Sequence, residues 1–197
     1  MTRREKVPRG DHDLRKVLAY GAVLAPALHT VTDGIEWAQG GFSPVQLWLN
    51  YLAFLPVPAL MLGLYAVQRP RISRLDLIGA LAYGFSFIYF AHTTLFAIAT
   101  AAPTYERLWD RLGPLYTVHG ALMIVGGAAF GWATVRSGVL PRWTASLFLA
   151  GLSLNLAVAL LPVPDLLQTL GTAVRNAGLV GMGLWLLRAP ERPRRAV

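Results

Sequence analysis

The sequence predicts an all-α integral membrane protein, a bundle of six transmembrane helices with both termini in the cytoplasm. Of its 197 residues, 55% are hydrophobic and 14% are charged, whereas charged residues make up about a quarter of a typical soluble domain. Six apolar segments approach the length that a helix needs to cross a bilayer. The basic residues lie in alternate connections between these segments. Together, these observations exclude an ordinary soluble domain.

The six predicted spans cover residues 17–38, 45–67, 75–100, 114–135, 143–161 and 165–187, between a basic leader over residues 1–16 and a basic tail over residues 188–197. The first span has an alternative interpretation. Its apolar start, followed by Ala25-Pro26-Ala27, is also typical of a cleavable signal peptide, and cleavage there would leave five helices. The amphipathic continuation of the segment favours a retained first helix.

The boundaries of the first two spans follow from local signals. Gly41 ends the first helix, and Ser43 followed by Pro44 provides an N-cap and a proline at the first helical position of the second. Pro56 and Pro58 lie inside the second span. Because proline lacks an N–H group and clashes with the preceding turn, we expect a kink there.

The later spans also have recognisable starts. Ser73 and Asp76 have the spacing of a capping box at the start of the third span. Pro114 opens the fourth span, Pro141 precedes the fifth, and Asp165 caps the sixth. Each segment therefore begins at a residue that favours a helix N-terminus.

The orientation follows from the basic residues. The leader, the connections 69–74 and 136–142, and the tail hold 15 of the 18 Lys and Arg residues. The opposite connections hold only Arg107 and Arg111, and Arg175 lies inside the last span. This positive-inside pattern places both termini in the cytoplasm, and we expect a multi-pass protein of a bacterial cytoplasmic membrane. Nucleic acid is not an expected partner, because the basic residues do not gather on one face.

Three ionisable side chains share one face of the first span. At about 100° per residue, His29, Asp33 and Glu36 fall within roughly 60° of arc. With a cytoplasmic N-terminus, they lie in the outer half of the membrane. These three residues are the candidate catalytic residues.

Other polar residues fall at a similar depth, between the membrane midplane and the outer side. Ionisable groups inside a bilayer are costly and usually face a bundle interior or a wet cavity. We therefore expect one pocket that opens outward. Its candidate ligand-binding residues are His92, His119, Asn155, Arg175 and Asn176.

Two cofactors are compatible with this set. His29 and Asp33, joined by His92 or His119, would form an open three-ligand site for zinc or iron. Alternatively, His92 and His119 on facing helices would ligate haem b. The chain has no cysteine, which excludes thiolate ligands.

The expected function is the binding of a small lipophilic molecule or a metal, with acid–base catalysis such as isomerisation or cyclisation of a lipid-soluble substrate. The pair formed by His29 and Asp33 resembles one in membrane sterol isomerases of the emopamil-binding type, over these two residues alone. A small-solute or anion transporter using Arg175 and a haem b membrane cytochrome remain alternatives. The expected partners are the lipid bilayer and, through small-residue spacings such as that of Gly127 and Gly131, a second copy of the chain. Packing within the chain would explain those spacings equally well.

Overall fold

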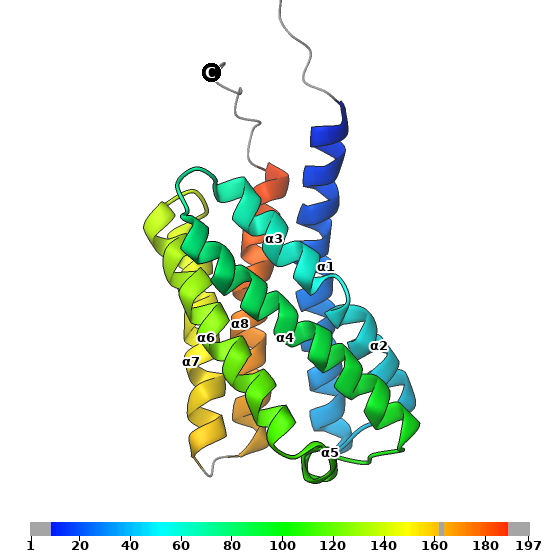
Figure 1. The fold of residues 1–197 in the computed structure, drawn as a ribbon. Coiled ribbons are helices and arrows are strands. Elements are labelled where there is room, and N and C mark those ends of the chain that lie inside the picture. The colour runs from blue at the N-terminus through cyan, green and yellow to red at the C-terminus, as the bar shows by residue number, and fades with distance from the viewer. Residues whose placement is uncertain (1–8, 162–163, 189–197) are drawn as a thin grey trace, which may run out of the picture.

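The computed structural model describes residues 9–161 and 164–188, and within these residues it contains eight α-helices and no strand. In chain order they are α1 (Arg9–Gln39), α2 (Pro44–Phe54), α3 (Val57–Gln68), α4 (Arg74–Ala99), α5 (Tyr105–Leu112), α6 (Pro114–Ser137), α7 (Arg142–Leu160) and α8 (Asp165–Arg188). The start of α1 and the end of α8 lie at the same end of one bundle (Figure 1). The predicted all-α class is confirmed.

Five helical segments are long and apolar enough to cross a membrane: Pro44–Gln68, Arg74–Ala99, Pro114–Ser137, Arg142–Leu160 and Leu166–Arg188. They indicate a multi-pass membrane protein. The 31 residues of α1 also run along the bundle, but α1 is not among the five. Its second half carries the ionisable residues His29, Asp33 and Glu36, which lower its hydropathy.

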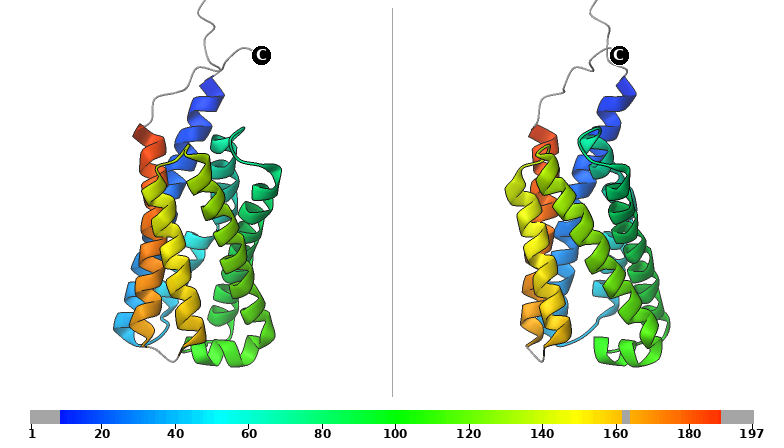
Figure 2. Two further views of the ribbon diagram at one scale, coloured as in Figure 1. Left: turned by 90° about the vertical axis from the view of Figure 1, so that its left-hand side faces the viewer. Right: turned by 60° about the vertical axis from the view of Figure 1, so that its left-hand side comes forward.

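The helices form a closed ring. Each contacts its neighbours in the order α1, α8, α7, α6, α4, and then the α2–α3 pair, which returns to α1. Figure 2 shows the long helices running side by side around this ring. Large side chains such as Tyr83, Phe87, Phe130 and Phe148 fill the centre and are at most 2% exposed. Apart from a small polar cluster around Gln68, the half of the ring near the chain ends is therefore a packed apolar core.

The segment predicted as one kinked helix over residues 45–67 consists of two helices. It breaks at Leu55 and Pro56, between α2 and α3. Pro56 and Pro58 cannot donate to the preceding turn, which accounts for the break. The expected start is present, because Ser43 caps α2 and accepts a hydrogen bond from the backbone nitrogen of Gln46 at 3.4 Å.

A short helix, α5, lies in what the sequence suggested to be a plain connection. Thr104 caps it, and Gly113, with φ of 57°, turns the chain sharply from α5 into α6. In Figure 1, α5 lies across the end of the bundle opposite the chain ends. The apolar residues among its eight recur at helical spacing on one face, and Leu108 is its buried residue.

Glycines let three pairs of helices approach closely. A Cβ atom added at Gly126 of α6 would lie 2.6 Å from the backbone nitrogen of Tyr83 on α4. Gly127 and Gly131 face leucine side chains of α7, and Gly151 of α7 lies against the backbone of Arg175 on α8. The small-residue spacing noted in the sequence thus serves packing within the chain.

Candidate functional site

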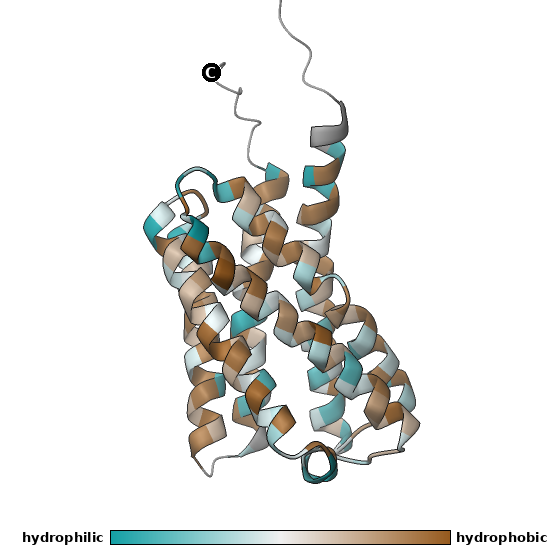
Figure 3. Ribbon diagram, in the orientation of Figure 1, coloured by the Kyte–Doolittle hydropathy of each residue, from teal (hydrophilic) through white to brown (hydrophobic). Residues whose placement is uncertain are grey.

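A pocket of about 540 Å³ lies inside the ring, on the side of the bundle where α5 lies. Residues of α1, α2, α4, α5, α6 and α8 line it. Figure 3 shows hydrophilic residues collecting in this half of the bundle, particularly along the second half of α1. The polar groups are thus concentrated where the core is hollow.

The pocket extends from the middle of the bundle to its α5 end. Arg175, ten residues into α8 and so about 15 Å along its axis, lines the pocket together with Met123. Gly41, Thr104 and Glu106 line it at the α5 end. The mouth of the pocket therefore lies at the α5 end of the bundle, opposite the chain ends.

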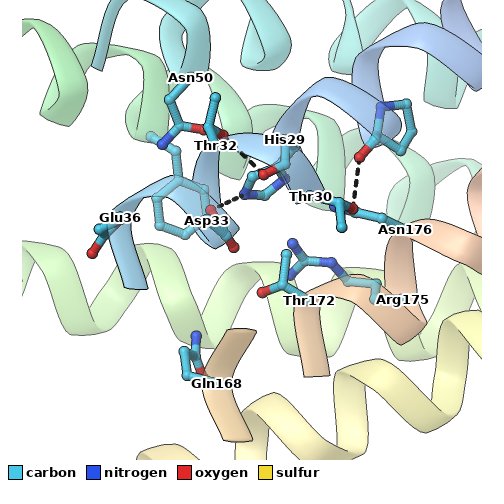
Figure 4. Close-up of polar contacts among 12 residues, drawn as sticks. His29, Thr30, Thr32, Asp33, Glu36, Asn50, Gln168, Thr172, Arg175 and Asn176 are labelled. Atoms are coloured by element: carbon cyan, nitrogen blue, oxygen red, sulfur yellow. Dashed lines mark hydrogen bonds and ion pairs between the residues drawn. The ribbon is translucent and has the colours of Figure 1, made fainter. Parts of the chain in front are cut away.

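The predicted polar face of α1 lies on the pocket wall. His29, Asp33 and Glu36 all line the pocket. The His29 Nε2 atom lies 3.4 Å from Asp33 Oδ1, an ion-pair distance, and Figure 4 shows the two side chains side by side. Glu36 accepts a hydrogen bond from Gln46 Nε2 at 3.4 Å. The three candidate catalytic residues thus share one cavity.

The neighbouring wall, formed by α8, carries the buried cation. Arg175 is 3% exposed, and its Nη1 atom donates to Asn155 Oδ1 at 3.3 Å and to Met123 Sδ at 3.1 Å. Its guanidinium carbon also lies 5.8 Å from the ring centre of Phe87, within cation–π range. Within the described chain, Arg175 forms no ion pair with a carboxylate, and its Nε atom has no hydrogen-bond partner.

Asn155 positions Arg175 rather than lining the pocket. Its Nδ2 atom donates to the backbone oxygen and the side chain of Gln168, both at 3.2 Å, and to Thr172 Oγ1 at 3.5 Å. Its Oδ1 atom is thereby oriented toward the guanidinium of Arg175. Asn155, a predicted ligand-binding residue, therefore contacts Arg175 and does not itself line the pocket.

Asn176 and Thr32 fix the walls in place. Asn176 Nδ2 donates to Thr30 Oγ1 at 3.1 Å, which joins α8 to α1. Thr32 Oγ1 lies 3.1 Å from Asn50 Oδ1, which joins α1 to α2. Asn176 was predicted to bind the ligand, but it does not line the pocket. It supports α1 through its hydrogen bond to Thr30 (Figure 4).

The structure places the other two candidate histidines, His92 and His119, outside the pocket. His92 is exposed on α4 and lines a separate cleft of about 230 Å³ between α4 and the α2–α3 break. His119 is 1% exposed and stacks on Tyr89 with ring centres 3.8 Å apart. The sequence did not indicate the direction in which each of these side chains points.

This arrangement does not assemble the predicted cofactor sites. Across the described residues, no group of three or more His, Asp or Glu side chains is placed to hold a metal ion. His29 and Asp33 are adjacent, but neither His92 nor His119 joins them. A haem b site between His92 and His119 is not assembled either, because His119 is not among the residues that line the cleft of His92.

Sequence reasoning missed the aromatic part of the wall. Phe54, Phe87 and Phe90 line the pocket, with ring centres 5.3 to 6.1 Å apart. The ring of His29 packs edge-on against Phe54 at 4.7 Å. In an apolar helix these phenylalanines look like any other core residues, so no sequence signal distinguished them.

The mouth of the pocket is acidic. Asp33, Glu36 and Glu106 line it near α5, together with Tyr105. A tyrosine hydroxyl is protonated at neutral pH, so Tyr105 can donate a hydrogen bond at the mouth.

The fold and the site together define an all-helical, multi-pass membrane protein with a polar pocket enclosed by its helices. No protein-family model matches the chain, and neither a curated protein nor a solved structure was found to match it. The residues of the pocket are therefore the basis for assigning a function.

Proposed function

We propose that this protein binds a small molecule carrying an anionic group, and that Arg175 binds that group inside the pocket. The observation that carries this proposal is a guanidinium group that is 3% exposed, lines a cavity of about 540 Å³ and forms no ion pair within the described chain. Arginine remains charged at any physiological pH. A ligand anion would supply the missing counter-charge.

The free energy of burial explains why an anion is the expected ligand. A charged side chain near the centre of a membrane costs on the order of 2.5–3.5 kcal/mol on insertion scales. Asn155, Met123 and the ring of Phe87 offset part of this cost, but all three are neutral. A planar guanidinium also matches a carboxylate or phosphate group in two parallel hydrogen bonds.

The aromatic wall suggests what the rest of the ligand is like. Phe54, Phe87 and Phe90 offer apolar surface next to Arg175. A molecule with a small apolar body and an acidic group would bury both parts. Small-molecule sites are commonly of this kind, mostly apolar with a few placed polar groups.

We further propose that α1 crosses the membrane as a sixth span in a bacterial cytoplasmic membrane. Both termini would then lie in the cytoplasm, as the distribution of basic residues predicts. The pocket would open to the outer side of the membrane, since its mouth lies at the end of the bundle opposite the chain ends.

Titration of the purified chain in lipid nanodiscs with hexanoate and benzoate tests the anion site. Binding should raise the unfolding temperature, whereas the neutral analogues 1-hexanol and benzyl alcohol should have much smaller effects. Arg175→Gln should abolish the response to the acids. Arg107→Gln, at an exposed arginine of α5 that does not line the pocket, should leave it intact. An equal response of wild type and Arg175→Gln would refute the proposal.

Acid–base chemistry is the second candidate, and the contact between His29 and Asp33 favours it. The two groups lie 3.4 Å apart on the wall that faces the bound molecule, which suits transfer of a proton to or from that molecule. Molecules extracted from the purified protein would be incubated with it in D₂O, and deuterium uptake measured by mass spectrometry. If the molecules take up deuterium as fast with the Asp33→Asn variant as with wild type, this role is excluded.

A further inference from the structure

We infer, on the basis of the proposed anion site, that the ligand is a zwitterion whose cationic group binds at Asp33 and Glu36 while its anionic group binds at Arg175. The neighbouring walls of the pocket that α1 and α8 form carry unlike charges. Among the buried polar atoms that lack hydrogen-bond partners in the described chain, those at the α1 side are the acceptors Asp33 Oδ1 and Gln46 Oε1, and the one at the α8 side is the donor Arg175 Nε; the others belong to Tyr83 and His119, which do not line the pocket. A ligand that satisfies both walls must present a donor at one end and an acceptor at the other.

The α1 side offers acceptors. Asp33 Oδ1 is buried and accepts no hydrogen bond in the described structure, although it lies at ion-pair distance from His29. Behind the wall, Gln46 Oε1 is likewise buried and without a hydrogen-bond partner, while the Nε2 atom of the same side chain donates to Glu36. The orientation of the Gln46 amide follows from that contact, because only its nitrogen can donate to a carboxylate.

The α8 side offers a donor. Among the described residues, the Nε–H group of Arg175 is buried and has no hydrogen-bond partner, and the side chain already uses its Nη1 atom on Asn155 and Met123. An arginine carries five N–H donors. This wall therefore retains donor capacity for an anion.

The two charged ends lie at different depths. The hydrogen bond between Asn176 and Thr30 places Arg175 next to the level of Thr30 on α1. Asp33 and Glu36 lie three and six residues further toward the mouth, which is about 5 and 9 Å along the helix axis. The arginine side chain leans back toward the start of α8, which shortens this gap. The anion would therefore bind deeper and the cation a few ångströms nearer the mouth.

The mouth is suited to capture of the cationic end. Glu106 also lines it, beside the rings of Tyr105 and Tyr116. Carboxylates with neighbouring aromatic faces are a common environment for an ammonium group. An amino acid with separated charges, an ω-amino acid, matches this arrangement better than a simple carboxylic acid of the same length.

The test compares matched probes on the full chain in nanodiscs by isothermal titration calorimetry. The probes are 6-aminohexanoate, hexanoate and 1-aminohexane, with 4-aminobutanoate and butanoate as a shorter pair. In wild type, at least one amino acid should bind about tenfold more tightly than its parent acid. Glu36→Gln or Asp33→Asn should remove this preference while hexanoate still binds. Arg175→Gln should abolish binding of both hexanoate and 6-aminohexanoate.

Asp110→Asn is the matched control, because Asp110 is an exposed carboxylate of α5 that does not line the pocket. It should leave the preference unchanged. Equal affinity for each amino acid and its parent acid in wild type would overturn the zwitterion proposal but keep the anion site. Tighter binding of the amino acids that persists in both Glu36→Gln and Asp33→Asn would overturn the assignment to these carboxylates. Absence of binding by every acid would overturn the proposed function itself.

Discussion

Two clusters of buried polar residues at opposite ends of the bundle differ in how completely their hydrogen bonds are satisfied. Near the chain ends, Gln68 is 0% exposed and donates to Leu64 O at 3.0 Å and to Thr134 Oγ1 at 3.2 Å. Its Oε1 atom accepts from Ser137 Oγ at 2.8 Å, and Thr134 Oγ1 donates to Phe130 O at 2.9 Å. Each polar side-chain atom of Gln68 thus has a partner.

The pocket cluster contains ionisable residues, and its hydrogen bonds are less completely satisfied. There Asp33 Oδ1 and Arg175 Nε lack hydrogen-bond partners within the described residues, and both side chains line a cavity. A satisfied network stabilises a fold, whereas unused donors and acceptors beside a cavity are costly unless something binds them. Buried polar residues therefore do not by themselves mark a binding site. The unused hydrogen-bonding capacity next to empty volume is what marks it.

The largest expected effect comes from the backbone contact that holds one wall of the pocket. Gly151→Ala would drive a Cβ atom into the backbone of Arg175. We expect a loss of about 3 kcal/mol in the free energy of unfolding, in line with overpacking of a tight contact, together with weaker hexanoate binding. Chemical unfolding in detergent measures the first and calorimetry the second. Gly120→Ala, where a Cβ would meet nothing within 4 Å, should be neutral or slightly stabilising.

The next effect separates the two clusters. Gln68→Ala removes the centre of the satisfied network and leaves Ser137 and Thr134 without it. The free energy of unfolding should fall by about 2 kcal/mol, because buried hydrogen bonds and packing are lost together. Hexanoate affinity should not change once the variant is folded. A large loss of affinity would mean that the two ends of the bundle are coupled.

Arg175→Met should have the opposite sign of effect on stability. It replaces a buried, unneutralised charge with an apolar side chain of similar length, so the ligand-free protein should gain about 1–2 kcal/mol. Anion binding should be lost at the same time. Thermal unfolding with and without hexanoate shows both results. A clear loss of stability would indicate that the contacts of Arg175 with Asn155 and Met123 outweigh the cost of its charge.

The smallest effect is expected for Asp33→Asn, which keeps the shape of the side chain and removes its charge. Asp33 Oδ1 accepts no hydrogen bond within the described part of the chain. The free energy of unfolding should therefore stay within about 1 kcal/mol of the wild-type value. A small increase would support a ligand-binding role for Asp33 better than a small decrease would. The same variant should lose the preference for 6-aminohexanoate over hexanoate. A fall of more than about 2 kcal/mol, with the preference intact, would assign Asp33 a purely structural role.

Much of the fold follows from local patterns that the sequence displays directly. The capping box of Ser73 and Asp76 is present, with the Ser73 backbone nitrogen 2.8 Å from the carboxylate. Pro56 interrupts the second apolar segment where a kink was expected. The shared face of His29, Asp33 and Glu36 lines one pocket, because helix periodicity alone sets which residues point together.

The amphipathic helix α5 shows the limit of that approach. Its eight residues are too few and too polar to register as a span. It forms because Thr104 caps it and Leu108 packs into a small cluster with Leu47 and Ala97. The pocket mouth depends on this helix, so the shape of the mouth was not predictable from hydropathy.

The sequence by itself determined the helical class, five of the six predicted membrane-length segments and the polar face of α1, since these depend on spacing and composition within one segment. Only the tertiary structure decided which polar residues at the same depth face one another. His92 and Arg175 lie on different helices, and each helix can be rotated about its own axis without any change in its hydropathy. That rotation is set by packing against neighbours, here by close contacts such as that of Gly151 with Arg175. It directs Arg175 into the pocket and His92 away from it.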